Sequence, residues 1–350
     1  MEINGIDVEI GPGVDLSYAC LSDADLSGVD LSGANLSEAL LQNTNLAGAN
    51  LSNSDLSRAW LHGADLSGAD LSNANLDGAL LVDANLSNVN LAKASLKRID
   101  ASGVNLSGAN LSNSDISQSF LENADMSDTD LSNVSLMSAN LTGTNLSAAN
   151  LFEANLHRIT ASGADFSGAN LSGAKIYQGM LENANLSDAD LSGAHLNRAW
   201  LNNVNLINAD LSRAQLESAN LYGSDLSDAN LTATNFLQSF LMEANLSGVN
   251  LSNATCFMAI FDEANLSGAN LSNASCVRAS FDKADLSGAN LTSANLKSST
   301  LRQADLSEAN LTGADVSWAV LHIANISGAN LFGANLKGTT MPDGLLNVSN

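Results

Sequence analysis

A strict five-residue period constrains this chain more than any other feature of its sequence. Leucine occupies 52 of the 66 positions taken every fifth residue from Leu16 to Met341. Alanine occupies 45 of the 66 positions that lie two residues earlier, from Val14 to Thr339. No insertion or deletion breaks the phase, and a period of five matches neither an α-helix nor a flat β-strand. The chain is therefore expected to repeat one short structural element along its length.

The Ala and Leu of each repeat are predicted to face a common interior. Residues two apart point to the same side of an extended chain, and Gly, Asn or Ser between repeats allows the backbone to turn. Two exceptions support the assignment, because Ala101 and Ala161 replace Leu where Ile99 and Ile159 replace Ala. Such an exchange of large and small side chains keeps the volume of one shared core roughly constant.

Cys256 and Cys276 are also inward positions and lie four repeats apart. A disulfide between them is within geometric reach. Stacked core thiols are the preferred interpretation, because the side chains would run parallel and three Cys in the whole chain make no disulfide framework.

The pattern A(D/N)LSx closely resembles the repeat of the pentapeptide-repeat family. The resemblance implies an all-β fold, a right-handed quadrilateral parallel β-helix with four repeats per coil and about 16 coils. The expected organisation is an N-terminal cap at residues 1–13, one solenoid at 14–341 and a C-terminal tail or cap at 342–350. Within the cap, residues 6–10 alternate like a strand after an Asn4-Gly5 turn. In the tail, Leu345, Leu346 and Val348 are expected to fold over the last coil.

Sorting the repeats by their place in a coil of four separates two conservative classes from two divergent ones. The conservative classes keep Asn or Asp before the Leu, whereas the divergent classes hold all the Trp, Tyr, His and Cys residues. We call the outward side chains of the divergent classes the divergent edge. Its predicted interaction residues are Trp60, Phe120, Met180, Trp200, Phe240, Ile260, Arg58, Arg98, Arg158 and Arg198. A similarity between two segments, RIDASG at Arg98 and RITASG at Arg158, indicates that duplication supplied part of the pattern.

Exposed aromatic and Arg side chains are typical of protein interfaces. The favoured function is therefore a non-catalytic protein-binding or scaffolding solenoid, whose partner is an unknown protein or another copy of the chain. The alternative is mimicry of DNA by the acidic faces, which would bind a basic DNA-binding enzyme such as gyrase, as some relatives of this family do. The residues predicted for that role are Asp65, Asp125, Asp190 and Asp210. A third possibility is a structural rod without a dedicated partner.

Composition argues against other classes of function. The formal charge is −24 with no basic run, which disfavours direct binding to nucleic acid or to an anionic membrane. The four His residues, His62, His157, His195 and His322, do not form a zinc-ligand pattern, and no nucleotide or nucleophile motif is present. We therefore predict no enzyme activity, no cofactor and no metal. Neither a signal peptide nor an apolar span is visible, so a location in the cytoplasm of a bacterium is expected.

Overall fold

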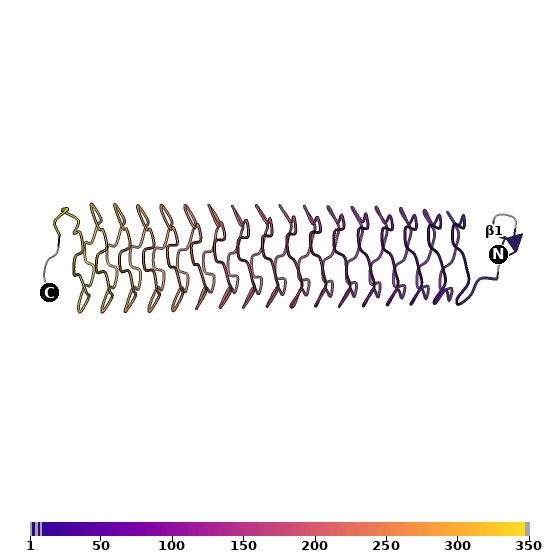
Figure 1. The fold of residues 1–350 in the computed structure, drawn as a ribbon, viewed down its shortest axis with the longest axis horizontal. Helices are drawn as coiled ribbons and strands as arrows, with labels where there is room; N and C mark the ends of the chain where they lie inside the picture. Colours follow the sequence, from indigo (N-terminus) through magenta and orange to yellow (C-terminus); the bar gives the residue numbers. More distant parts are fainter. Residues whose placement is uncertain (1, 4–5, 8, 347–350) are drawn as a thin grey trace. The chain divides into compact units, whose positions relative to one another are not determined.

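The computed structural model describes residues 2–3, 6–7 and 9–346. It contains two compact units, Met1–Lys175 and Ile176–Asn350, here called the N-terminal unit and the C-terminal unit. Figure 1 shows that each unit consists of stacked coils that follow one another along the chain. The named strands are β1 (Glu2–Ile3) and β2 (Ile6–Asp7), and all other pairing among the described residues occurs through single bridges.

Each five-residue repeat forms one tight turn and one bridge. In the first repeat the backbone N–H of Ala19 donates to the carbonyl of Leu16, which closes a β-turn. The third residue of that turn, Tyr18, has a φ of 59°, as type II turns require. The same positive φ recurs in the other turns, where it is occupied by Gly, Asn, Asp, Arg and other residues.

Parallel bridges join residues 20 apart, for example Asp15 with Asn35 and Trp60 with Leu80. Four repeats therefore complete one coil, and each side of a coil pairs with the same side of the next. The predicted quadrilateral parallel β-helix is confirmed in each unit.

The core of each unit is formed by the inward Leu and Ala columns. Most of these side chains are less than 2% exposed. The two exchanged pairs are buried as predicted, with Ile99 at 1% and Ala101 at 0% exposure. Cys256 and Cys276 are fully buried free thiols, as expected. The hydrogen bond to Cys276, burial and charge repulsion from Cys276 all raise the pKa of the Cys256 thiol.

Buried hydroxyls satisfy carbonyl groups inside this core. Thr144 Oγ1 donates to the carbonyl of Leu121 in the preceding coil at 2.7 Å, and Ser114 Oγ donates to Leu111 within its own turn at 2.7 Å. Thr and Ser at inward positions are therefore compatible with a core that is otherwise apolar.

The chain termini differ in part from the expectation. β1 and β2 pair antiparallel, with Ile3 opposite Ile6, so the strand is shorter than the predicted 6–10 because Glu9 and Ile10 are not in a strand. Asn4, Gly5 and Val8 lie outside the described residues. At the other end, Thr340 bridges antiparallel to Leu346. The chain thus turns back beside the last coil, and the side chains of Leu345 and Leu346 are exposed after this reversal. Val348 also lies outside the described residues.

Candidate functional site

The divergent edge of the N-terminal unit carries apolar side chains at bridge positions. Leu40, Trp60 and Leu80 occupy consecutive coils, and Phe120 follows two coils later. Trp60 is 46% exposed and Phe120 is 53% exposed, whereas the corresponding positions of the conservative faces hold Asn or Asp. The ring of Trp60 lies 6.3 Å from that of His62. The geometry thus places large apolar groups in solvent on the side of the coil where the sequence predicted them.

The C-terminal unit repeats this arrangement. Met180, Trp200 and Phe240 are exposed, whereas Ile260 is only half-buried rather than fully outward. Bridges connect Met180 with Trp200, Trp200 with Asn220, Asn220 with Phe240, and Phe240 with Ile260. These side chains consequently form one column, interrupted by a single Asn.

The four predicted Arg residues share the third position of their turns. Arg58, Arg98 and Arg158 in the N-terminal unit and Arg198 in the C-terminal unit have φ values of 56–58° and exposed side chains. Arg58 Nη1 lies 3.4 Å from Glu38 Oε1, and the guanidinium of Arg198 lies 5.9 Å from the ring centroid of Tyr177. Exposed pairs of this kind contribute little to stability. Because all four Arg residues occupy the same turn position, the conformation of the turn projects their guanidinium groups from the corner of the coil.

A shallow concavity of about 590 Å³ lies at this corner in the N-terminal unit. Gly78 falls between Arg58 and Arg98 in the column of turn residues, and its missing side chain leaves a notch between the two cations. Glu38, Asp55 and Asp77 also line the notch, so its charges are mixed.

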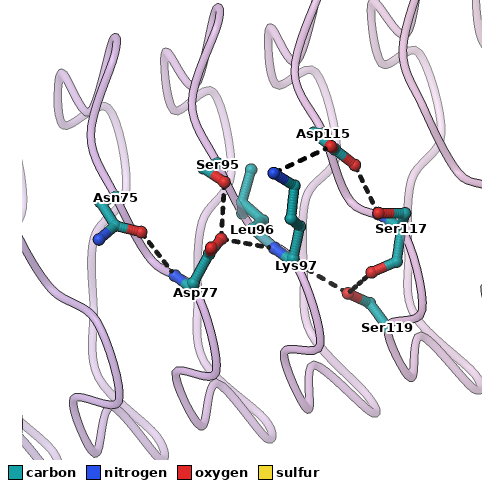
Figure 2. Close-up of polar contacts among 8 residues, drawn as sticks. All are labelled: Asn75, Asp77, Ser95, Leu96, Lys97, Asp115, Ser117 and Ser119. Atoms are coloured by element: carbon teal, nitrogen blue, oxygen red, sulfur yellow. Dashed lines mark hydrogen bonds and ion pairs between the residues drawn. The ribbon is translucent and has the colours of Figure 1, made fainter.

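Asp77 supports a neighbouring turn, as Figure 2 shows. In most turns the Asn or Asp at the bridge position accepts a hydrogen bond from the N–H two residues later, as Asn75 does from Asp77 N at 3.1 Å. The next coil has Ser95 at that position. There the carboxylate of Asp77 accepts hydrogen bonds from Ser95 Oγ at 2.6 Å and from the N–H of Lys97 at 3.0 Å.

The C-terminal unit contains the same replacement at Ser280. Asp262 Oδ1 accepts hydrogen bonds from Ser280 Oγ and from the N–H of Asp282, the latter at 3.1 Å. Sequence reasoning missed both supports. The available signal was a Ser at an Asn/Asp position, together with an Asp at a Ser position in the preceding coil.

The predicted acidic residues Asp65 and Asp125 lie on the bridge column of one conservative face and are part of hydrogen-bond ladders. Asp65 accepts from the N–H of Ser67 at 3.0 Å and from Asn85 Nδ2 at 3.0 Å. The backbone N–H and the hydroxyl of Ser67, together with Asn85, lower the pKa of Asp65 below its ordinary value, although burial opposes them. Asp125 is bonded in the same way by Ser127 and Asn145.

Asp190 and Asp210 belong to the second conservative face, and they bridge each other directly. Each accepts the N–H of its own turn, and Asp210 also accepts from Asn230 Nδ2 at 3.0 Å. Two carboxylates cannot donate to each other, so the amide ladder is interrupted between them.

Among the described residues, no group of three or more His, Cys, Asp or Glu side chains is arranged to hold a metal ion. Within residues 2–3, 6–7 and 9–346, which the structure describes, no helix is long and apolar enough to cross a membrane.

Comparison with known proteins identifies similar repeats. A family model described as pentapeptide repeats matches successive segments between residues 12 and 338. No curated protein sequence matches the chain significantly.

Three solved structures illustrate the similarity. HetL, a pentapeptide repeat protein involved in heterocyst differentiation regulation from the cyanobacterium Nostoc sp. strain PCC 7120, is 30% identical over 71% of this chain and 92% of its own, with a TM-score of 0.34. QnrB1, a plasmid-mediated fluoroquinolone resistance protein, is 18% identical over 56% of this chain and 88% of its own, with a TM-score of 0.35. Rfr23 from the cyanobacterium Cyanothece 51142 is 26% identical over 44% and 88% of the two chains, with a TM-score of 0.22.

Proposed function

This chain belongs to the pentapeptide-repeat family, and we propose that it is a non-catalytic protein-binding or scaffolding solenoid that acts through its divergent edge. The observation that carries the proposal is the exposure of large aromatic groups in a column that could hold Asn or Asp. Trp200 is 53% exposed on such a bridge position, while its counterparts on the conservative faces are polar. Exposed Trp and Arg side chains that gather on one surface are characteristic of protein interfaces.

Mimicry of DNA by the acidic faces is the second candidate, and the spacing of the carboxylates weighs against it. On the two conservative bridge columns of the N-terminal unit, eight coils carry seven Asp, namely Asp25, Asp65, Asp125 and Asp165 in one column and Asp30, Asp70 and Asp130 in the other. At about 4.8 Å per coil this gives roughly one carboxylate every 5.5 Å. Double-stranded DNA carries one charge about every 1.7 Å of its axis. The carboxylates on these two columns are therefore much more widely spaced along the axis than the phosphate charges of DNA.

The two candidates are separated by substitutions on the two surfaces. Partners covalently crosslinked to the full chain in cells are quantified for edge variants, Trp60→Ser with Phe120→Ser and Trp200→Ser with Phe240→Ser, and for a face variant, Asp65→Asn with Asp125→Asn. Binding through the edge is expected to fall in the edge variants, to persist in the face variant and to weaken less with salt than binding by a DNA mimic. If the amount of crosslinked partner is unchanged in both edge variants, the proposal is contradicted. If no specific partner is captured at all, a structural rod without a dedicated partner remains.

A DNA mimic behaves in the opposite way. Purified protein titrated into a gyrase supercoiling reaction would inhibit it, the Asp→Asn changes would relieve the inhibition, and the effect would weaken steeply with salt.

We place this protein in a reducing compartment such as the cytoplasm, where the adjacent core thiols Cys256 and Cys276 stay reduced.

A further inference from the structure

The C-terminal unit carries more exposed apolar side chains along its divergent edge than the N-terminal unit does. We call Met180, Trp200, Phe240 and Ile260 the apolar ladder. Its turns add exposed Tyr222 and Met242 on one flank and Met258 on the other. The ladder therefore forms a strip that is several side chains wide and five coils long.

The backbone beneath the ladder has no free pairing groups at its two aromatic steps. The N–H of Trp200 donates to the carbonyl of Gly179 in the preceding coil, and its carbonyl accepts from the N–H of Leu181. Phe240 is bonded in the same way, because its N–H donates to Ala219 and its carbonyl accepts from Leu221. An extended peptide cannot add to this face as a strand, so an occupant must satisfy its own backbone and contribute side chains only.

The spacing of the ladder matches that of an α-helix. Successive coils lie about 4.8 Å apart. A helix that runs along the ladder presents side chains every three or four residues, or about every 4.5–6.0 Å. The four steps from Met180 to Ile260 span about 19 Å, which is the length of a helix of about 13 residues.

Charge on the flanks defines the occupant further. Glu243 and Asp262, on the flank of Tyr222 and Met242, form no ion pair with any residue that the structure describes, whereas the other flank holds the exposed Arg198 beside Glu217. Glu243 instead accepts a hydrogen bond from Tyr222. The chain as a whole has a formal charge of −24, which opposes the approach of a second copy. A positively charged partner is attracted by the same field.

We propose that the apolar ladder of the C-terminal unit binds an amphipathic α-helix of a partner protein, as long as the ladder itself, with Lys or Arg beside its apolar stripe. This inference rests on the proposed function and names the class of partner. The helix lies along the coils, with one of its apolar side chains near each step of the ladder. Its cations lie opposite Glu243 and Asp262.

Three labelled peptides, each one turn longer than such a helix, test the inference on the full chain by fluorescence anisotropy. The first has Leu at helical spacing with Lys beside it, the second has the same composition with Leu at every other position, and the third replaces Lys by Glu in the first. The first peptide is expected to bind at least tenfold more tightly than the other two. The Trp200→Ser, Phe240→Ser variant is expected to weaken it at least tenfold, whereas the matched Trp60→Ser, Phe120→Ser variant in the N-terminal unit changes it less than twofold.

Several outcomes overturn the inference. Equal binding of the first two peptides would show that the surface binds apolar peptides without recognising a helix. Peptide binding that survives the Trp200→Ser, Phe240→Ser change would show that the binding site lies outside the apolar ladder. A dimer of the chain alone in sedimentation, dissociated by that same change, would identify a second copy as the occupant. If no peptide binds while edge-dependent crosslinking in cells persists, the helix is excluded and the proposed function stands. If no peptide binds and crosslinking in cells does not depend on the edge, the proposed function is contradicted as well.

Discussion

The carboxylate of Asp77 accepts a hydrogen bond from the backbone N–H of Lys97, which lies one coil further along the chain. One coil thereby supplies the polar support that the next coil lacks, because Ser95 stands where Asn or Asp usually accepts this N–H. The side chain of Lys97 continues the contact toward Asp115, with Nζ 3.4 Å from Oδ2 (Figure 2).

Removing this support is expected to destabilise the N-terminal unit, and a second change should restore it. Asp77→Ala leaves the N–H of Lys97 without its acceptor, at a cost of about 1–2 kcal/mol in the free energy of unfolding. Adding Ser95→Asn places an amide oxygen in the usual position and should recover most of that loss. Urea unfolding of the single and double variants measures both effects. Asp128→Asn serves as the control, because it removes an exposed carboxylate from the same unit and Asn tolerates the positive φ there. Failure of the second change to rescue the first would contradict this account.

Ser119 and Ser114 provide a matched pair of buried hydroxyls. Ser119 Oγ accepts from the N–H of Ile99 at 3.2 Å and donates to the carbonyl of Leu96 at 2.9 Å. Ser114 Oγ only donates, to a carbonyl that also accepts the N–H of Ser114. Ser119→Ala strands a buried N–H and should cost about 2 kcal/mol, whereas Ser114→Ala should cost less than about 1 kcal/mol. Equal losses in thermal or urea unfolding would count against this difference in hydrogen bonding.

Ile99 and Ala101 are expected to be strongly coupled. Ile99→Ala opens a cavity and should cost about 2–4 kcal/mol, and Ala101→Leu alone should cost about 1–3 kcal/mol through crowding. The double variant restores the usual Ala and Leu, so its stability should lie within about 1 kcal/mol of the parent. A double-mutant cycle measures the coupling. Additive losses would mean that the two side chains do not share one space.

Acid is expected to weaken the hydrogen-bond ladder at Asp65. The pKa of Asp65 is lowered in the folded state, first by the backbone N–H of Ser67. Its stabilising contribution is therefore fully present above the ordinary Asp pKa of about 3.9 and is lost as the pH falls through the lower folded value. In Asp65→Asn this titration is absent, so the unfolding free energy should decline less between about pH 5 and about pH 2 than in the parent. Parallel curves for the two proteins would refute the assignment.

The repeat made the fold predictable, because the inward positions are specified by volume and polarity alone. Ile99 beside Ala101 was enough to show that two columns share one interior. The divergent edge could be recognised for the same reason, since Trp60 and Trp200 occupy outward positions, where packing of the core does not call for an apolar side chain.

Side-chain supports between coils were not predictable from the repeat, because they break its pattern. Asp77 lies in a column that usually holds Ser, and its role depends on a residue one coil further on. The exposure of the tail was not predictable for a different reason: the apolar character of Leu345 and Leu346 does not specify the direction of the reversal that leaves both side chains in solvent.

The bridges that join successive coils also have a consequence for synthesis on the ribosome. The bridges of the described coils join residues only 20 apart in the sequence. A coil therefore gains its last backbone partner as soon as the following coil has emerged. At about 5–20 residues per second, a coil is completed about every 1–4 s. The growing end of the nascent chain can thus wind coil by coil, and its newest coil is the part of that end that still presents an unpaired edge to chaperones and proteases.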